Sequence, residues 1–235
     1  MKLNEQLSRS IVAAKDKKTL SLIFDMDDYE RRHAQAINQA IAKCRELNGH
    51  FGLNVFIIPG MLDAQQVKAV HDVPGLVPCL HGFFHKPKEC QGWTRDMANK
   101  ALTWAEKAQF NKVFRAPFWE TSDGLYEAIR ERQWVIADHP KKVEKARSNG
   151  LAEWQIYIPA YGMDTLLQMS DWEIWSLDGL VKLHGHPKHL EAMIKVVGRL
   201  MSIDAIVPTF RSIWKNQREL KGKYDGPDPD NQRRV

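Results

Sequence analysis

Short apolar segments alternate with amphipathic helical segments along most of this 235-residue chain, and this alternation constrains the fold more than any other feature. Apolar, strand-like segments are expected at 19–24, 53–58, 77–80, 113–114, 134–137, 180–183 and 205–208. Helices are expected at 31–47, 63–71, 94–109, 122–132 and 190–201. Strands that alternate with helices form a parallel sheet covered by those helices. The pattern therefore predicts a mainly parallel α/β fold, either an open doubly wound sheet or a barrel.

No stretch rich in Pro, Gly or Ser divides the chain, so a single folded domain is expected. We place an N-terminal helical extension at 1–18, the folded domain at 19–215 and a basic, disordered tail at 216–235. The segment 151–176 is aromatic and irregular. Two interpretations of it stay open: an insertion that faces the substrate, or a contact in a homo-oligomer.

Composition excludes several classes of protein. No apolar run approaches the length of a membrane-spanning helix, and charges interrupt the N-terminal segment where a secretion signal would need an apolar core. Three cysteines without CxxC spacing argue against a disulfide framework and a cysteine zinc site, so a cytoplasmic protein is expected. Lys and Arg number 34 against 29 Asp and Glu, for a net charge of +5. Without a nucleic-acid-binding motif this excess is too small to predict such a partner.

Polar side chains follow several of the expected strands. The candidates are Asp25, Asp27, Asp28, His81, His85, Arg115, Asp138, His184 and His186. In parallel α/β folds the ligand site lies at the carboxyl ends of the strands. Carboxylates and imidazoles that converge there suit zinc or another first-row transition metal. The pattern therefore predicts a metal site at this edge of the sheet.

Each of these groups also has an ordinary structural explanation. The aspartates fit a solvated turn, Arg115 fits an ion pair, and His184 with His186 fits a loop of turn composition. Their coincidence at successive strand ends favours a site. The histidines without such a placement are interpreted as surface or helix residues: His33, His50 and His71.

The motif order resembles the polysaccharide deacetylase superfamily (NodB homology, carbohydrate esterase family 4). The resemblance covers about residues 19–210 and rests on an acidic pair, a His-x3-His motif, Arg-x-Pro-aromatic, a strand ending in Asp, and Leu-x-His. It implies one domain built as an irregular seven-stranded (β/α) barrel. It also implies a metal-dependent hydrolase that removes an N- or O-acyl group, acetyl above all, from a sugar-like substrate.

The resemblance implies a role for each matched residue. Asp28, His81 and His85 would hold one divalent ion, zinc first and cobalt, manganese or nickel as alternatives. Asp27 would be the base that deprotonates a metal-activated water, and His184 the acid that protonates the leaving group. The remaining catalytic and substrate-binding candidates are Arg115, Asp138, Tyr29, Pro117, Phe118, Trp119 and His186.

Arg115 would orient the base, and the aromatic segment after it would form a groove wall. Asp138 has two interpretations, as a partner of a histidine or as a cap of the following loop. The backbone N–H near Tyr29 would support the oxyanion, and His186 would contact substrate.

Two positions depart from the family pattern. Tyr29 follows the acidic pair where the family has glycine, and Gly82 follows the first histidine where the family has Ser or Thr. These departures indicate a divergent branch, in which the substrate is either a carbohydrate or a cytoplasmic small molecule such as a nucleotide sugar.

Two other functions remain open. The segment 22–27 also resembles the first motif of haloacid-dehalogenase phosphatases, with Asp25 as nucleophile, Asp27 as acid and Mg²⁺ as cofactor. That interpretation gives the histidines no task. The other alternative is an inactive relative that binds carbohydrate or protein, and metal content would distinguish it.

Overall fold

A computed structural model of the chain describes residues 21–170, 173–174, 177 and 180–201. The strands are β1 (Ser21–Tyr29), β2 (Leu53–Ile57), β3 (Leu76–His81), β4 (Val113–Arg115), β5 (Val135–Ala137), β6 (Ile156–Tyr157), β7 (Tyr161–Gly162) and β8 (Leu180–Gly185). The α-helices are α2 (Arg31–Leu47), α3 (Ala64–Ala69), α4 (Arg95–Lys107), α5 (Asp123–Glu131), α6 (Val143–Ser148), α7 (Met163–Gln168) and α9 (Leu190–Met201). The expected extension 1–18, strand 205–208 and tail 216–235 lie outside the described residues.

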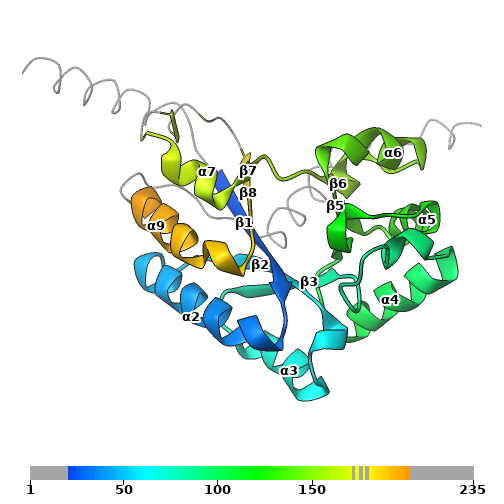
Figure 1. Cartoon of the computed structure of the whole chain (residues 1–235), viewed down its shortest axis with the longest axis horizontal. Helices are drawn as coiled ribbons and strands as arrows, with labels where there is room; N and C mark the ends of the chain where they lie inside the picture. Colours follow the sequence, from blue (N-terminus) through cyan, green and yellow to red (C-terminus); the bar gives the residue numbers. More distant parts are fainter. Residues whose placement is uncertain (1–20, 171–172, 175–176, 178–179, 202–235) are drawn as a thin grey trace, which may run out of the picture.

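The strands form one curved parallel sheet in the order β6-β5-β4-β3-β2-β1-β8-β7, with helices along its outer side (Figure 1). The expected single-domain, mainly parallel fold of the (β/α) barrel type is confirmed. The sheet has eight strands where seven were expected, because the two-residue segments β6 and β7 each extend an edge. Both come from the irregular segment 151–176, which therefore completes the sheet.

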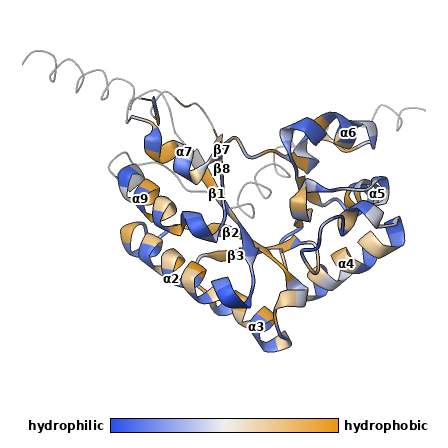
Figure 2. Cartoon of the chain, viewed as in Figure 1, coloured by the Kyte–Doolittle hydropathy of each residue, from blue (hydrophilic) through white to orange (hydrophobic). Residues whose placement is uncertain are grey.

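Side chains along β1 alternate between two apolar clusters. Phe24 and Met26 belong to the main core, and Ile23 belongs to a smaller cluster with residues of the neighbouring strands. Because strand side chains alternate, Asp25 and Asp27 lie on the same face as Ile23. Figure 2 shows hydrophobic and hydrophilic residues interspersed along the helices, as in amphipathic helices that cover a sheet.

Two strands run further than the sequence predicts. The strand expected at 19–24 continues in β1 through the three aspartates to Tyr29. The strand expected at 180–183 continues through His184 to Gly185. Acidic residues disfavour strands by local propensity, but here burial and pairing with partners on other strands override that preference.

Helix starts follow the sequence closely. Thr94 accepts a hydrogen bond from the Met97 backbone N–H (3.3 Å) and begins α4, as expected. Ser122 accepts from the Leu125 N–H (3.1 Å) and begins α5. The helix expected at 63–71 is the shorter α3 followed by a 3₁₀ turn. Among the described residues, every helix is too short or too polar to cross a bilayer.

Candidate metal centre

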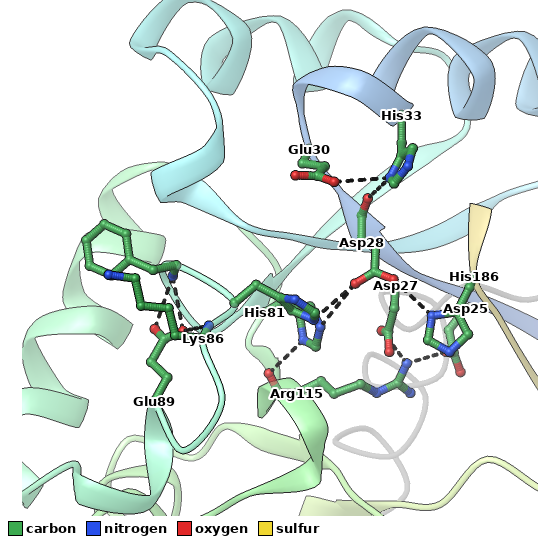
Figure 3. Close-up of polar contacts among 12 residues, drawn as sticks. Asp25, Asp27, Asp28, Glu30, His33, His81, Lys86, Glu89, Arg115 and His186 are labelled. Carbon is green, nitrogen blue, oxygen red and sulfur yellow. Dashed lines mark hydrogen bonds and ion pairs between the residues drawn. The ribbon is translucent and has the colours of Figure 1, made fainter. Parts of the chain in front are cut away.

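An irregularity in β1 brings two successive aspartates to one site. The register with β2 shifts between Met26 and Tyr29, and Asp28 has a left-handed backbone with φ of 60°. In a regular strand Asp27 and Asp28 would face opposite sides of the sheet. The bulge turns Asp28 back toward the side of Asp27, as Figure 3 shows. Strained backbone of this kind gathers at functional sites.

His33 supports this backbone. Its Nδ1 lies 3.1 Å from the carbonyl oxygen of Asp28 and 3.4 Å from Glu30 Oε1 (Figure 3). Sequence reasoning interpreted His33 as a surface or helix residue. Its contact with the Asp28 backbone gives it a positioning task, and only the fold shows it.

Asp28 faces the two histidines of the His-x3-His motif. Its Oδ1 lies 3.1 Å from Nε2 of His85 and 3.8 Å from Nε2 of His81. One ligand atom from each residue lies within 4.8 Å of the others. Nδ1 of His81 lies 3.1 Å from the Arg115 carbonyl oxygen, so this nitrogen is the donor and Nε2 keeps its lone pair for a metal.

The atoms present fit a divalent transition metal. Asp28 Oδ1 is buried and has no well-aligned hydrogen bond among the described residues, although the ring of His85 is close. Burial raises the pKa of Asp28, but contacts with His186, His85 and His81 lower it more, so the carboxyl stays ionised. Burial lowers the pKa of His81 and favours the neutral, metal-binding imidazole. One carboxylate and two imidazoles leave coordination positions open.

A glutamate holds the loop between the two histidines. Glu89 accepts hydrogen bonds from the backbone N–H groups of Phe83 (2.5 Å), Phe84 (3.1 Å) and Lys86 (3.3 Å). Glu89 thereby fixes the backbone of the loop that joins His81 to His85. Sequence reasoning did not find Glu89, because nothing in its spacing predicts three backbone donors.

Gly82 is explained by the same loop. Its φ is +55°, and an added Cβ would lie 2.6 Å from Pro117 Cγ. A Ser or Thr side chain would therefore collide with Pro117 and strain the backbone. The departure from the family pattern at this position follows from the close approach of the two loops.

A buried arginine joins two aspartates beside the metal group. Nη1 of Arg115 donates to Asp25 Oδ1 (2.6 Å) and to Asp27 Oδ1 (2.7 Å). Its guanidinium lies between the rings of Phe56 (4.0 Å) and Trp119 (4.8 Å). Burial raises the pKa of Asp27, but the positive charge of Arg115 lowers it by more. The resulting pKa lies below the usual range of an aspartate. Asp27 is therefore an ionised carboxylate, as a general base must be.

Asp25 is the partner of His184, which sequence reasoning did not predict. Nδ1 of His184 lies 2.7 Å from Asp25 Oδ1, and Nε2 lies 3.6 Å from Asp27 Oδ2. Tyr157 OH donates to the other Asp25 oxygen (2.8 Å). Burial raises the pKa of Asp25, but Arg115 and His184 lower it to well below its usual value. Nδ1 of His184 thus lies against an ionised carboxylate and against Arg115 Nη1 (2.9 Å).

Asp138 fits the second of its two interpretations. It accepts hydrogen bonds from Tyr126 OH (2.7 Å) and from the backbone N–H of His139 (2.8 Å). These bonds hold the loop after β5. The pairing with a histidine, the first interpretation, is made by Asp25 with His184 instead, because β1 lies beside β8 in the sheet and β5 does not.

The substrate-binding candidates divide into two groups. Tyr29 is 3% exposed and donates to Asn38 Oδ1 (3.2 Å), and Pro117 is buried, so neither side chain is open to substrate. Phe118 is 53% exposed, and its ring centroid lies 5.0 Å from that of His85. Trp119 lies 5.7 Å from the His184 ring.

His186 also lies at the rim of the site. Its Nδ1 is 3.0 Å from Asp28 Oδ2, on the side of Asp28 away from the other two histidines (Figure 3). Its side chain is 41% exposed, so it lies at the surface of the cluster.

The fold and the site together define a parallel α/β barrel with one carboxylate and two histidines at the carboxyl ends of its strands. No family model matches the chain, and no curated protein matches it either. Solved structures do match the chain. One is a family 4 acetyl xylan esterase from Clostridium thermocellum in complex with a cobalt ion. Its TM-score is 0.55 at 11% sequence identity, and the match covers 84% of this chain and 92% of that one.

Two further structures match as well. A Streptococcus mutans CE4 esterase has a TM-score of 0.53 at 12% identity, over 86% of this chain and 90% of its own. The Xyl-CE4 domain of a multidomain xylanase from the hindgut metagenome of Trinervitermes trinervoides has a TM-score of 0.51 at 11% identity, over 86% and 92%. The chain therefore has the fold of the family 4 carbohydrate esterases, the NodB-like fold that its motifs predict.

Proposed function

We propose that this chain is a divalent-metal-dependent hydrolase that removes an N- or O-acyl group, acetyl above all, from a sugar-like substrate. The observation that carries the proposal is the arrangement of Asp28 Oδ1 against Nε2 of both His81 and His85. The similar structures named as CE4 and acetyl xylan esterases support the same reaction class.

A divalent ion held by Asp28, His81 and His85 would polarise the acyl carbonyl and lower the pKa of the attacking water. The two imidazoles favour zinc, with cobalt, manganese and nickel as alternatives.

Asp27 is placed to accept the proton of the attacking water. Arg115 holds one of its oxygens and leaves Oδ2 on the side of His184. His184 is placed to donate a proton to the leaving amine or alcohol through Nε2, because Asp25 holds its Nδ1. Phe118 and Trp119 would contact the sugar at the rim.

The phosphatase alternative gains nothing from the structure. Its nucleophile would be Asp25, whose side chain is fully buried and bonded to Arg115, His184 and Tyr157. A nucleophile must approach the phosphorus atom of the substrate, and the buried Asp25 carboxylate contacts Arg115, His184 and Tyr157 instead.

Metal content and hydrolysis of a panel of N- and O-acetylated sugars test the proposal. His81→Ala should lose both bound metal and turnover. Asp27→Asn should keep the metal and lower kcat by about 10²–10⁴-fold, since it removes the base alone. His50→Ala, at an exposed histidine far from the motifs, is the matched control and should change neither.

Two results would contradict the proposal. Wild-type protein without transition metal would favour an inactive binding relative. Full turnover by Asp27→Asn would remove the base from its assigned role.

A further inference from the structure

A second group of metal-ligating side chains lies beside the first. Asp27, His184 and His186 each offer one ligand atom, and these atoms lie within 4.8 Å of one another. The group shares no residue with Asp28, His81 and His85. The two groups touch, because Nδ1 of His186 is 3.0 Å from Asp28 Oδ2.

Both imidazoles of this group are held as metal ligands are held. Nδ1 of His184 lies 2.7 Å from Asp25 Oδ1 and 2.9 Å from Arg115 Nη1, and Nδ1 of His186 lies 3.0 Å from Asp28 Oδ2. A histidine that binds metal through one nitrogen almost always donates its other N–H to a carboxylate or carbonyl. In each ring the nitrogen without that bond, Nε2, keeps a lone pair.

The carboxylate of the group is held in the same way. Asp27 Oδ1 accepts from Arg115 Nη1 (2.7 Å), while Oδ2 lies 3.6 Å from Nε2 of His184. One oxygen is therefore fixed by a partner and the other faces the imidazoles. The orientation of all three side chains is set by groups outside the triad.

From this arrangement we infer that Asp27, His184 and His186 form a second cation site, which takes zinc or a similar first-row transition ion. Two imidazoles and one carboxylate favour such ions over magnesium or calcium, which prefer oxygen ligands.

Charge sets the order in which the two sites fill. The cluster holds Asp25, Asp27 and Asp28 against the single guanidinium of Arg115. One divalent ion balances the remaining negative charge, so a second ion enters a cluster that is already neutral. Arg115 also lies directly on Asp27. The Asp28 site therefore fills first and the second site binds more weakly.

The consequence for activity rests on the proposed function. Asp27 and His184 are the proposed base and acid, and an ion bound to both takes the lone pairs through which they would move protons. Filling the second site therefore inhibits the enzyme: activity rises with the first equivalent of zinc and falls with the second.

Zinc binding to metal-free protein, followed by calorimetry and by metal analysis after equilibrium dialysis, tests the site without reference to activity. Wild type should show two classes of site. His186→Gln, which keeps an N–H donor for Asp28, should weaken the second class by about 10–100-fold and leave the first unchanged. His85→Gln should weaken the first class.

His50→Ala is the control, because His50 is an exposed histidine that belongs to neither group. It should leave both classes unchanged. A single class in wild type, or a second class that His186→Gln leaves unchanged, would overturn the site while the proposed function stands.

Activity measured along the same titration separates the two proposals. A fall in turnover as the second class fills, reversed by removing that zinc, supports both. Binding of the second class without loss of turnover would overturn the inhibition and the roles of Asp27 and His184.

Discussion

At the scale of single residues, Asp25 is a charged side chain that is shielded from solvent. The side chain is fully buried, yet Arg115, His184 and Tyr157 together satisfy both oxygens. A buried charge is tolerated only when it is paired and hydrogen-bonded in this way. The partners also keep its pKa low, so the acceptor for His184 Nδ1–H remains an anion.

Replacing Asp25 by asparagine should therefore lower kcat with little change in KM. The isosteric amide keeps the shape but no longer stabilises a proton-carrying His184, and a loss of about 10–100-fold is expected. Zinc content should stay that of wild type, which distinguishes positioning from collapse of the site. Tyr157→Phe removes the other contact of the same carboxyl and is the control, with a much smaller effect. Wild-type kcat in Asp25→Asn would contradict this role.

Residues with local signals were predictable and residues with distant partners were not. Asp28, His81 and His85 stand in short motifs whose spacing points to a metal. Asp25 and Tyr157 meet across 132 positions of sequence, so their pairing exists only once the barrel is folded. The task of Asp138 stayed open for the same reason.

At the scale of elements, the longer helices were predicted closely, whereas the short helices α6 and α7 were not predicted. Apolar periodicity and capping residues are local, and they place the starts of α4 and α5 correctly. The carboxyl ends of β1 and β8 were placed too early, because polar residues ordinarily end a strand. In this fold those polar residues belong to the candidate site, and strands β1 and β8 continue through them.

The ionised side chain of Glu106 links α4 to the neighbouring segments, and protonation at low pH should weaken these contacts. Glu106 of α4 accepts from Trp134 Nε1 (3.0 Å) and pairs with Lys112 (3.0 Å) and Arg132. Burial raises its pKa, but these three contacts lower it more, and the net pKa lies below the usual value. Because the folded pKa is depressed, the stabilisation is present above the unfolded pKa and is lost as pH falls through the folded one.

Glu106→Gln should therefore reduce the free energy of unfolding by about 1 kcal/mol at pH 7. The difference from wild type should shrink below about pH 4. Urea unfolding of both proteins across this range measures it. Glu131→Gln, which loses only an exposed pair with Arg95, should cost about 0.5 kcal/mol or less. A Glu106 effect that is constant with pH would show that the charge is not its cause.

At the scale of the whole molecule, the site draws together both ends of the described chain. The strands that carry it are β1, β3, β4 and β8, so it forms only when the sheet has curved and β8 has paired with β1. A ligand that binds this arrangement and not the unfolded chain stabilises the entire fold. A metal ion bound by these residues would therefore couple its binding to folding.

Zinc should raise the midpoint of thermal unfolding, and a chelator should reverse the rise. Free zinc at about a hundred times the dissociation constant of the Asp28 site adds about 2.7 kcal/mol, which corresponds to about 5–10 °C for a domain of this size. His81→Ala should lose most of this shift at the same zinc concentration, because the second cation site binds more weakly, and His50→Ala should retain it. Calorimetric melting with and without zinc measures both. An equal shift in His81→Ala would place the stabilising ion elsewhere, since the proposed ligand set joins His81 on β3 to Asp28 on β1, two strands that β2 separates.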